Sequence, residues 1–182
     1  VVHLSIGARY MQYCVNIGRT MMIDPTKTME EIYAAATAAQ EAALATLIDG
    51  ADLAAPFAAA KQALLEANPA GRGEELVAML GKTVGHAIGL ELREKSISLG
   101  PKFRGSAQTI RAGQCFNIQI ALANLTNEDV KQNSKLRTWA IMIADTALVT
   151  SDGKPPEILT KNVKKHVQDI AYQINDDEKE EL

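Results

Sequence analysis

The feature that most constrains the fold is an alanine-rich segment at residues 29–49, in which Ala, Leu, Glu and Gln predominate. These residue types favour helix, and the apolar ones recur at helical spacing. Thr28 and Glu31 have the spacing of a capping box at its start, and Gly50 is a natural C-terminal cap. A helix face of small residues permits close packing, so we expect this helix to lie against a sheet. The recurring apolar positions are Ile32, Ala36, Ala39, Ala43 and Leu47.

Residues 1–23 predict a β-hairpin that precedes this helix. A short apolar strand at 1–6 is followed by a tight connection at 7–9 and a long strand at 10–23. Gly18 within the long strand indicates a bulge or a close backbone approach. Pro25 ends the strand, because proline has no backbone N–H for the ladder.

The remainder of the chain predicts two further helices and then mostly strands, which together indicate an α+β fold. We expect residues 1–175 to form one domain and residues 176–182 to be a solvated acidic tail or linker. The chain starts at Val1 inside a predicted strand, so we expect it to be a piece of a larger protein. The helices are predicted at 53–67 and 74–81, the strands at 96–99, 114–125, 136–149 and 156–160, and a last helix at 162–174.

Charge and composition narrow the classes of function. The net charge is −3 and the pI is about 5.7, which argues against a general nucleic-acid binder. No apolar run approaches the roughly 20 residues that cross a bilayer. Cys14 and Cys115 lie in apolar runs and are predicted to be free buried thiols, which fits a reducing compartment.

The best candidate for chemistry is His86, in the stretch GHAIGLELRE at residues 85–94. A dinuclear hydrolase site needs several carboxylates beside a histidine, and Glu91 and Asp145 are the nearest candidates. On the residues alone, a structural histidine is favoured over a metal ligand. A basic cluster near the C-terminus is better interpreted as a solvated face than as a partner or phosphate contact. Its members are Lys161, Lys164, Lys165 and His166.

Two of these stretches resemble the pita-bread metallopeptidases, the family of aminopeptidase P and methionine aminopeptidase. VVHLSIGARYMQYCVNIGRT at residues 1–20 resembles the hairpin that carries two metal-binding Asp residues in active members. GHAIGLELRE resembles the Gly-His-Gly-Ile-Gly stretch, whose histidine is a ligand, and Arg93 stands where these peptidases have a second histidine. The five positions that the resemblance places at the metal site are Ser5, Asn16, His86, Gln119 and Ala144.

The resemblance therefore implies a pita-bread fold without its chemistry. Residues 1–175 would be the C-terminal lobe of this peptidase-like domain, and its N-terminal part would be absent from this chain. Four ligand positions have lost their carboxylates, and a pair of divalent ions held by one imidazole would lack charge compensation and coordination. We expect no catalytic residue, no metal and no cofactor.

A more specific resemblance is to the catalytically inactive peptidase-like domain of the large subunit of the FACT histone chaperone. It is carried by the GARY-x-x-YC-x-N-I-x-RT hairpin, by IGLE-x-RE, by the I-x-DT-x-LV pattern at residues 143–149 and by the acidic run after residue 175. His86 departs from the pattern, because these relatives usually have an aromatic residue there.

This resemblance implies binding of core histones during nucleosome disassembly and reassembly in transcription and replication. It also implies a nuclear protein without membrane or sequence-specific nucleic-acid contacts, which would meet the small FACT subunit through a later domain outside this chain. A divergent aminopeptidase or prolidase and a structural interaction module remain the alternatives. The candidate histone contacts are Glu91, Glu94, Asp145, Asp176, Asp177 and Glu178.

Overall fold

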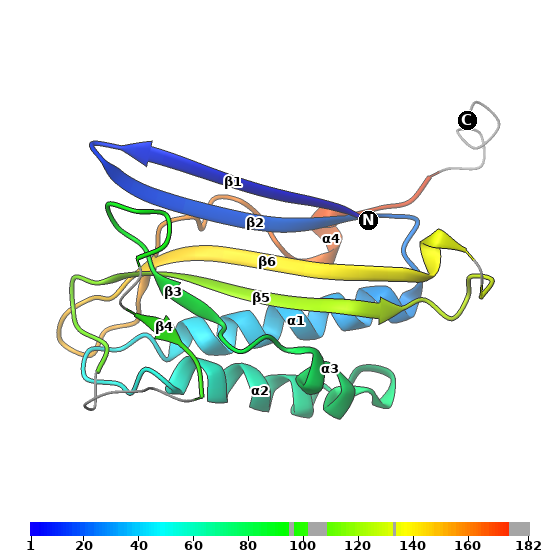
Figure 1. Ribbon diagram of the computed structural model, residues 1–182, viewed down its shortest axis with the longest axis horizontal. Coiled ribbons are helices and arrows are strands. Elements are labelled where there is room, and N and C mark those ends of the chain that lie inside the picture. The colour runs from blue at the N-terminus through cyan, green and yellow to red at the C-terminus, as the bar shows by residue number, and fades with distance from the viewer. Residues whose placement is uncertain (95–96, 102–108, 133, 175–182) are drawn as a thin grey trace.

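The fold is a twisted sheet covered on one face by helices, as the computed structural model shows (Figure 1). The structure describes residues 1–94, 97–101, 109–132 and 134–174. Within them the sheet has eight strands, six of which follow the order β1-β2-β6-β5-β3-β4, while β7 pairs with β6 and β8 with β2. The predicted α+β arrangement is confirmed.

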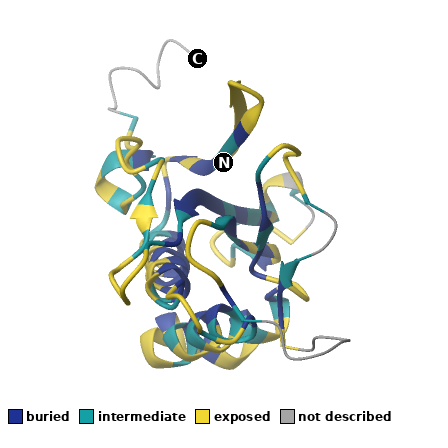
Figure 2. Cartoon of the chain, turned by 90° about the vertical axis from the view of Figure 1, so that its left-hand side faces the viewer, coloured by how far each residue is buried: buried dark blue, intermediate teal, exposed yellow. Residues whose placement is uncertain are grey.

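The hairpin consists of β1 (Val2–Tyr10) and β2 (Tyr13–Ile23), paired without a bulge from Val2↔Met21 to Tyr10↔Tyr13. The predicted connection at 7–9 is wrong, because the turn is formed by Met11 and Gln12. Both have positive φ, 44° and 70°, as a two-residue hairpin turn of the I′ type requires. Glycine was the misleading signal, since here two residues with side chains adopt the left-handed conformation. Every residue of β1 is exposed, which Figure 2 shows as the yellow strand at the top.

The first helix, α1 (Lys27–Ala45), lies against β5 and β6 as its small-residue face predicts. Its N-cap is Thr26, whose hydroxyl accepts a hydrogen bond from the Met29 amide at 3.4 Å. The predicted capping box is therefore wrong, and Thr28 lies inside the first turn. The predicted C-terminal cap is also wrong, because the helix ends at Ala45. Gly50 belongs to the following loop, where its N–H donates to the Ile110 carbonyl at 2.8 Å.

A second helical layer packs on α1. It contains α2 (Ala55–Ala67), the short 3₁₀ turn η1 (Pro69–Gly71) and α3 (Gly73–Met79). Asn68 ends α2 in the left-handed conformation, and its side-chain oxygen accepts from the Gly73 amide at 2.8 Å. Both predicted helices are confirmed to within two residues at each end.

The strands predicted at 114–125, 136–149 and 156–160 are confirmed. The strand predicted at 96–99 is confirmed only at 98–99, and residue 96 lies outside the described residues. The predicted last helix is mostly wrong. Only α4 (Val167–Ile170) is helical in that region, and the chain continues directly into β8 (Ala171–Tyr172). The apolar spacing at 162–174 predicted a longer helix than the structure has. Residues before 167 follow an irregular path, in which the carbonyls of Val163 and Lys164 accept hydrogen bonds from Arg19 of β2. The strands are β3 (Gly85–Ala87), β4 (Ser98–Leu99), β5 (Cys115–Thr126), β6 (Thr138–Leu148) and β7 (Glu157–Ile158), with η2 (Lys135–Arg137) before β6.

The hydrophobic core lies between the sheet and α1, and Figure 2 shows it as the dark blue interior. Alternation along β5 and β6 supplies Phe116, Ile118, Ile120, Ile141 and Ile143, each no more than 1% exposed. Cys14 and Cys115 are free thiols, as predicted. Cys14 is buried as predicted, whereas Cys115 is only half-buried. Among the described residues, no helix is both long and apolar enough to cross a membrane.

Candidate functional site

The five positions that the sequence singled out lie on five neighbouring strands. Ser5 is on β1, Asn16 on β2, Ala144 on β6, Gln119 on β5 and His86 on β3. Directly paired residues project to the same face of a sheet, as do residues two apart. The register Ser5↔Gly18↔Ala144↔Gln119 and the pair His86↔Asn117 therefore put all five on one face, opposite α1.

The hairpin end of this face is neutral and internally bonded. The Asn16 amide nitrogen lies 3.5 Å from the Ser5 hydroxyl. The main chain of Asn16 is held by the Thr146 hydroxyl, which accepts from its N–H at 3.0 Å and donates to its carbonyl at 2.8 Å. Asn117 also donates to that carbonyl at 3.0 Å. Neutral side chains thus hold this part of the strand pair in place.

The other end of the face contains a small cavity of about 200 Å³ that His86, Gln119 and Arg93 share. The Nδ1 atom of His86 lies 3.1 Å from the Ala87 carbonyl, so the neutral ring donates there and leaves Nε2 as an acceptor. Burial lowers the pKa of the His86 imidazole, and the nearby Arg93 guanidinium lowers this pKa further. The cavity therefore holds a neutral histidine beside a cation.

These residues do not fit a pair of divalent metal ions. A cation pair needs anionic oxygen ligands to offset its charge, and the face offers a hydroxyl, two amides and a methyl group instead. Ala144 has no donor atom, and its Cβ packs where a side chain at Gly18 would lie, 3.0 Å away. No group of three His, Cys, Asp or Glu residues with metal-binding geometry occurs in the described part of the chain. The residues on this face therefore do not form a dinuclear metal site.

Asp145, proposed as a histone contact, is not placed for that role. It follows Ala144 in β6 and so projects to the opposite, helix-covered face, where it is 1% exposed. Its carboxylate accepts from the Arg19 guanidinium at 2.8 Å, the Thr160 hydroxyl at 2.6 Å and the Gln40 amide at 3.0 Å. Asp145 was predicted to be a surface carboxylate, because the alternation of side chains along a strand does not show which face of the sheet the helices cover.

Sequence reasoning also missed the partner of Asp145. Arg19 uses all five of its N–H groups: besides Asp145, it donates to four backbone carbonyls. Two of these belong to the irregular segment before α4, one to the preceding residue of β2 and one to the neighbouring strand β6. Retention of Arg19-Thr20 in the hairpin was the one signal that could have indicated a structural role. The four carbonyls, at 2.7–2.9 Å, are those of Gly18, Ala144, Val163 and Lys164.

The other predicted contacts lie at the surface or beyond the described residues. Glu91 is exposed in the turn after β3, and its amide donates to the Glu94 carboxylate at 3.1 Å, so Glu94 partly serves to hold that turn. Asp176, Asp177 and Glu178 lie outside the described residues. The basic cluster is not on a helix. Lys165 is directed inward: its Nζ lies 2.8 Å from Oε1 of the Gln40 side chain and 3.5 Å from the Asp145 carboxylate.

With this geometry established, comparison with known proteins gives a family. The sequence model of metallopeptidase family M24 matches residues 1–151. The chain belongs to this family.

Among proteins of known name, this M24 chain is similar to FACT complex subunit SPT16. The rice protein is 38% identical over 178 residues, which are 98% of this chain and 15% of that protein. The Arabidopsis thaliana protein is 34% identical over 181 residues, 100% of this chain and 16% of the relative. The chain therefore spans about one sixth of the length of these relatives. The resemblance to a FACT subunit is confirmed.

Solved structures agree on the fold. The N-terminal domain of SPT16 from chickpea superposes with a TM-score of 0.82 at 31% identity, covering 93% of this chain and 37% of that one. Dipeptidase PepE from Mycobacterium ulcerans gives 0.70 at 22% identity, covering 94% and 40%. The second likeness shows the fold alone, and the two together confirm the predicted pita-bread architecture of this M24 chain.

Proposed function

We propose that this M24 chain is a non-catalytic peptidase-like domain that binds core histones in the nucleus, as part of a FACT-type histone chaperone. Residues 1–175 would form the domain, and residues 176–182 an acidic tail or linker. Histone exchange during nucleosome disassembly and reassembly would be the task of the whole protein, and a small partner subunit would bind elsewhere on it. Similarity over nearly the whole chain to FACT complex subunits supports this proposal.

The observation that carries the proposal is an M24-type sheet with neutral side chains at four of the five positions that the resemblance assigns to the metal site. Ser5, Asn16, Gln119 and Ala144 lie on the same sheet face as His86, spread over five neighbouring strands. None of the four can supply an anionic ligand. A face that keeps its geometry while losing its charged ligands favours recognition over hydrolysis.

The histone contacts are proposed to be electrostatic. Glu91 and Glu94 lie in the same turn as Arg93, which lines the cavity that contains His86. Asp176, Asp177 and Glu178 would extend the negative charge along the C-terminal tail. Carboxylates of this kind accelerate and orient encounter with basic segments. Asp145 is omitted from the proposed contacts, because its carboxylate is enclosed and already paired.

Titration of purified core histones against the chain at near-physiological salt tests the proposal. Saturable binding that weakens in Glu91→Gln/Glu94→Gln, with His86→Ala binding as wild type, is the expected result. A large loss in His86→Ala would show that the cavity has acquired a new role. Absence of histone binding would instead favour a structural module that contacts other chromatin factors.

Metal analysis with a peptidase assay tests the enzymatic alternative. We expect no stoichiometric divalent metal and no turnover of proline-containing dipeptides after loading with Mn²⁺, Co²⁺ or Zn²⁺. Two tightly bound ions per chain together with turnover would establish a divergent aminopeptidase or prolidase and overturn the proposal.

A further inference from the structure

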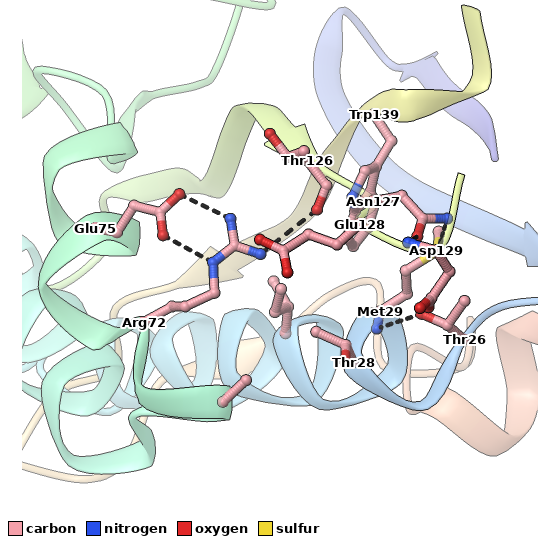
Figure 3. Close-up of a pocket in the computed structure, with 12 residues that line it drawn as sticks. Thr26, Thr28, Met29, Arg72, Glu75, Thr126, Asn127, Glu128, Asp129 and Trp139 are labelled. Carbon is pink, nitrogen blue, oxygen red and sulfur yellow. Dashed lines mark hydrogen bonds and ion pairs between the residues drawn. The ribbon is translucent and has the colours of Figure 1, made fainter. Parts of the chain in front are cut away.

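A second pocket lies at the far end of the sheet, away from the five positions described above. It has a volume of about 360 Å³, within the roughly 300–1,000 Å³ of typical ligand pockets. The end of β5, the start of β6 and the first turn of α1 enclose it, with Arg72 and Glu75 on the remaining side (Figure 3). None of the residues used in the proposed function lines it.

The wall of this pocket contains an unpaired indole. Trp139 is 6% exposed, and its Nε1–H has no hydrogen-bond partner among the residues that the structure describes. An enclosed donor without an acceptor costs about 1–3 kcal/mol, so buried polar groups are normally paired. Figure 3 shows Trp139 facing the pocket interior, with the Glu128 side chain extending past it toward Arg72. Because Glu128 is exposed and has no described ion-pair partner within 4.0 Å, its movement would open a path to the indole.

The charge of the pocket indicates what kind of ligand it would take. Arg72 and Glu75 neutralise one another through two hydrogen bonds of 2.7 Å, which lower the pKa of Glu75. Glu128 and Asp129 then remain, two carboxylates with no ion pair within 4.0 Å among the described residues. The pKa of the Arg72 guanidinium is raised mainly by its hydrogen bond with Glu75 and also by the charge of Glu128. The N-terminus of α1 contributes a partial positive charge of only about 0.5. The net field therefore favours a cation.

We propose that this pocket receives a lysine or arginine side chain of a basic peptide segment. The cationic group lies between Glu128 and Asp129, and a main-chain carbonyl next to it accepts from the Trp139 indole N–H. A peptide supplies both groups within one residue, which a free metal ion or a simple amine does not. The inference deepens the proposed function and rests on it for the source of the segment, a histone.

Trp139 is the single tryptophan of the chain, so its indole reports on this pocket alone. A short amidated lysine-rich peptide is titrated against the chain, and the one indole N–H resonance and the tryptophan fluorescence are followed. We expect a saturable shift of the resonance. Glu128→Gln/Asp129→Asn should weaken binding about tenfold, the equivalent of about 1.4 kcal/mol.

Two further variants make the test specific. Glu74→Gln/Glu157→Gln removes the same charge from exposed positions outside the pocket and should leave peptide affinity within twofold of wild type. Trp139→Phe keeps an aromatic ring without the N–H and should lower the affinity of a fluorescently labelled peptide at least threefold. Equal weakening by both double variants would overturn the pocket, because only overall charge would then matter.

The outcome separates this inference from the proposed function. Histone binding with an unmoved indole resonance refutes the pocket and leaves the proposed function intact. A shift with the lysine-rich peptide in a chain that does not bind histones supports the pocket and refutes the proposed function.

Discussion

The enclosed pair of Arg19 and Asp145 makes the sharpest prediction about stability. The two side chains are 7% and 2% exposed, and Nη2 of the guanidinium lies 2.8 Å from the carboxylate. Arg19→Met removes this ion pair and also leaves four backbone carbonyls without their donor. Asp145→Asn leaves the guanidinium without its counter-ion.

Each single substitution should lower the free energy of unfolding by about 3–5 kcal/mol, the usual cost of breaking a buried pair. Domains of this kind are stable by only about 5–15 kcal/mol, so each change removes a large share. In Arg19→Met/Asp145→Asn the combined loss should fall short of the sum of the single losses by about 1–3 kcal/mol, because neither Arg19 nor Asp145 is then left as an unpaired charge. Lys165, which loses Asp145 in this variant, keeps Glu41 at 3.5 Å. Urea unfolding followed by circular dichroism at neutral pH measures all four proteins of the cycle.

A surface pair provides the control. Lys27 and Glu31 lie 4.0 Å apart with side chains 88% and 43% exposed, so Lys27→Met should cost no more than about 0.5 kcal/mol. Single losses at Arg19 and Asp145 no larger than that of the control, or losses that simply add, would refute the reasoning.

Three further predictions concern single positions. Tyr33 is fully buried, its hydroxyl has no hydrogen-bond partner in the described part of the chain, and burial raises its pKa to about 12. Tyr33→Phe should therefore preserve stability or raise it by about 1 kcal/mol, and a clear loss in urea unfolding would mean that the hydroxyl is bonded. Gly85→Ala places a methyl group 2.6 Å from the Asn117 carbonyl oxygen. It should lower the free energy of unfolding by about 1–3 kcal/mol, and the melting temperature should fall accordingly. Its control, Gly81→Ala, meets nothing closer than 3.7 Å and should melt within a few degrees of wild type. The lowered pKa of His86 means that the unfolded chain binds its proton more readily, so wild-type stability should fall relative to His86→Ala as pH drops below about 6.5. Parallel stability curves for the two proteins between pH 7 and 5 would contradict this.

Local patterns in the sequence predicted the core helices and strands to within about two residues, but they misplaced the hairpin turn, the caps of α1 and the last helix. The alternation in β5 and the small-residue face of α1 reflect burial, which leaves a strong periodic signal. The hairpin turn was misplaced because β1 is exposed along its length, so no alternation fixed its end. The helix predicted at 162–174 failed for another reason: the carbonyls of Val163 and Lys164 bond to Arg19, a partner more than 140 positions away that local spacing cannot reveal.

For the site, residue-by-residue resemblance named five positions, and the strand register places all five on one face. It could not indicate which side of β6 faces the helices, and Asp145 was assigned to the wrong one. The pocket around Trp139 was missed altogether. Its residues come from four separate segments, and no motif in the chain links them.

The bonds of Arg19 also bear on how the chain folds. The β1–β2 hairpin closes over a two-residue turn, whereas Arg19 reaches carbonyl and carboxylate groups 125–145 positions away. Closing chain segments of that length is entropically costly, so such contacts form late relative to local ones. Substitutions at Arg19 should then accelerate unfolding far more than they slow refolding. The contacts of the guanidinium would thus mainly slow unfolding, and so would set the lifetime of the native state.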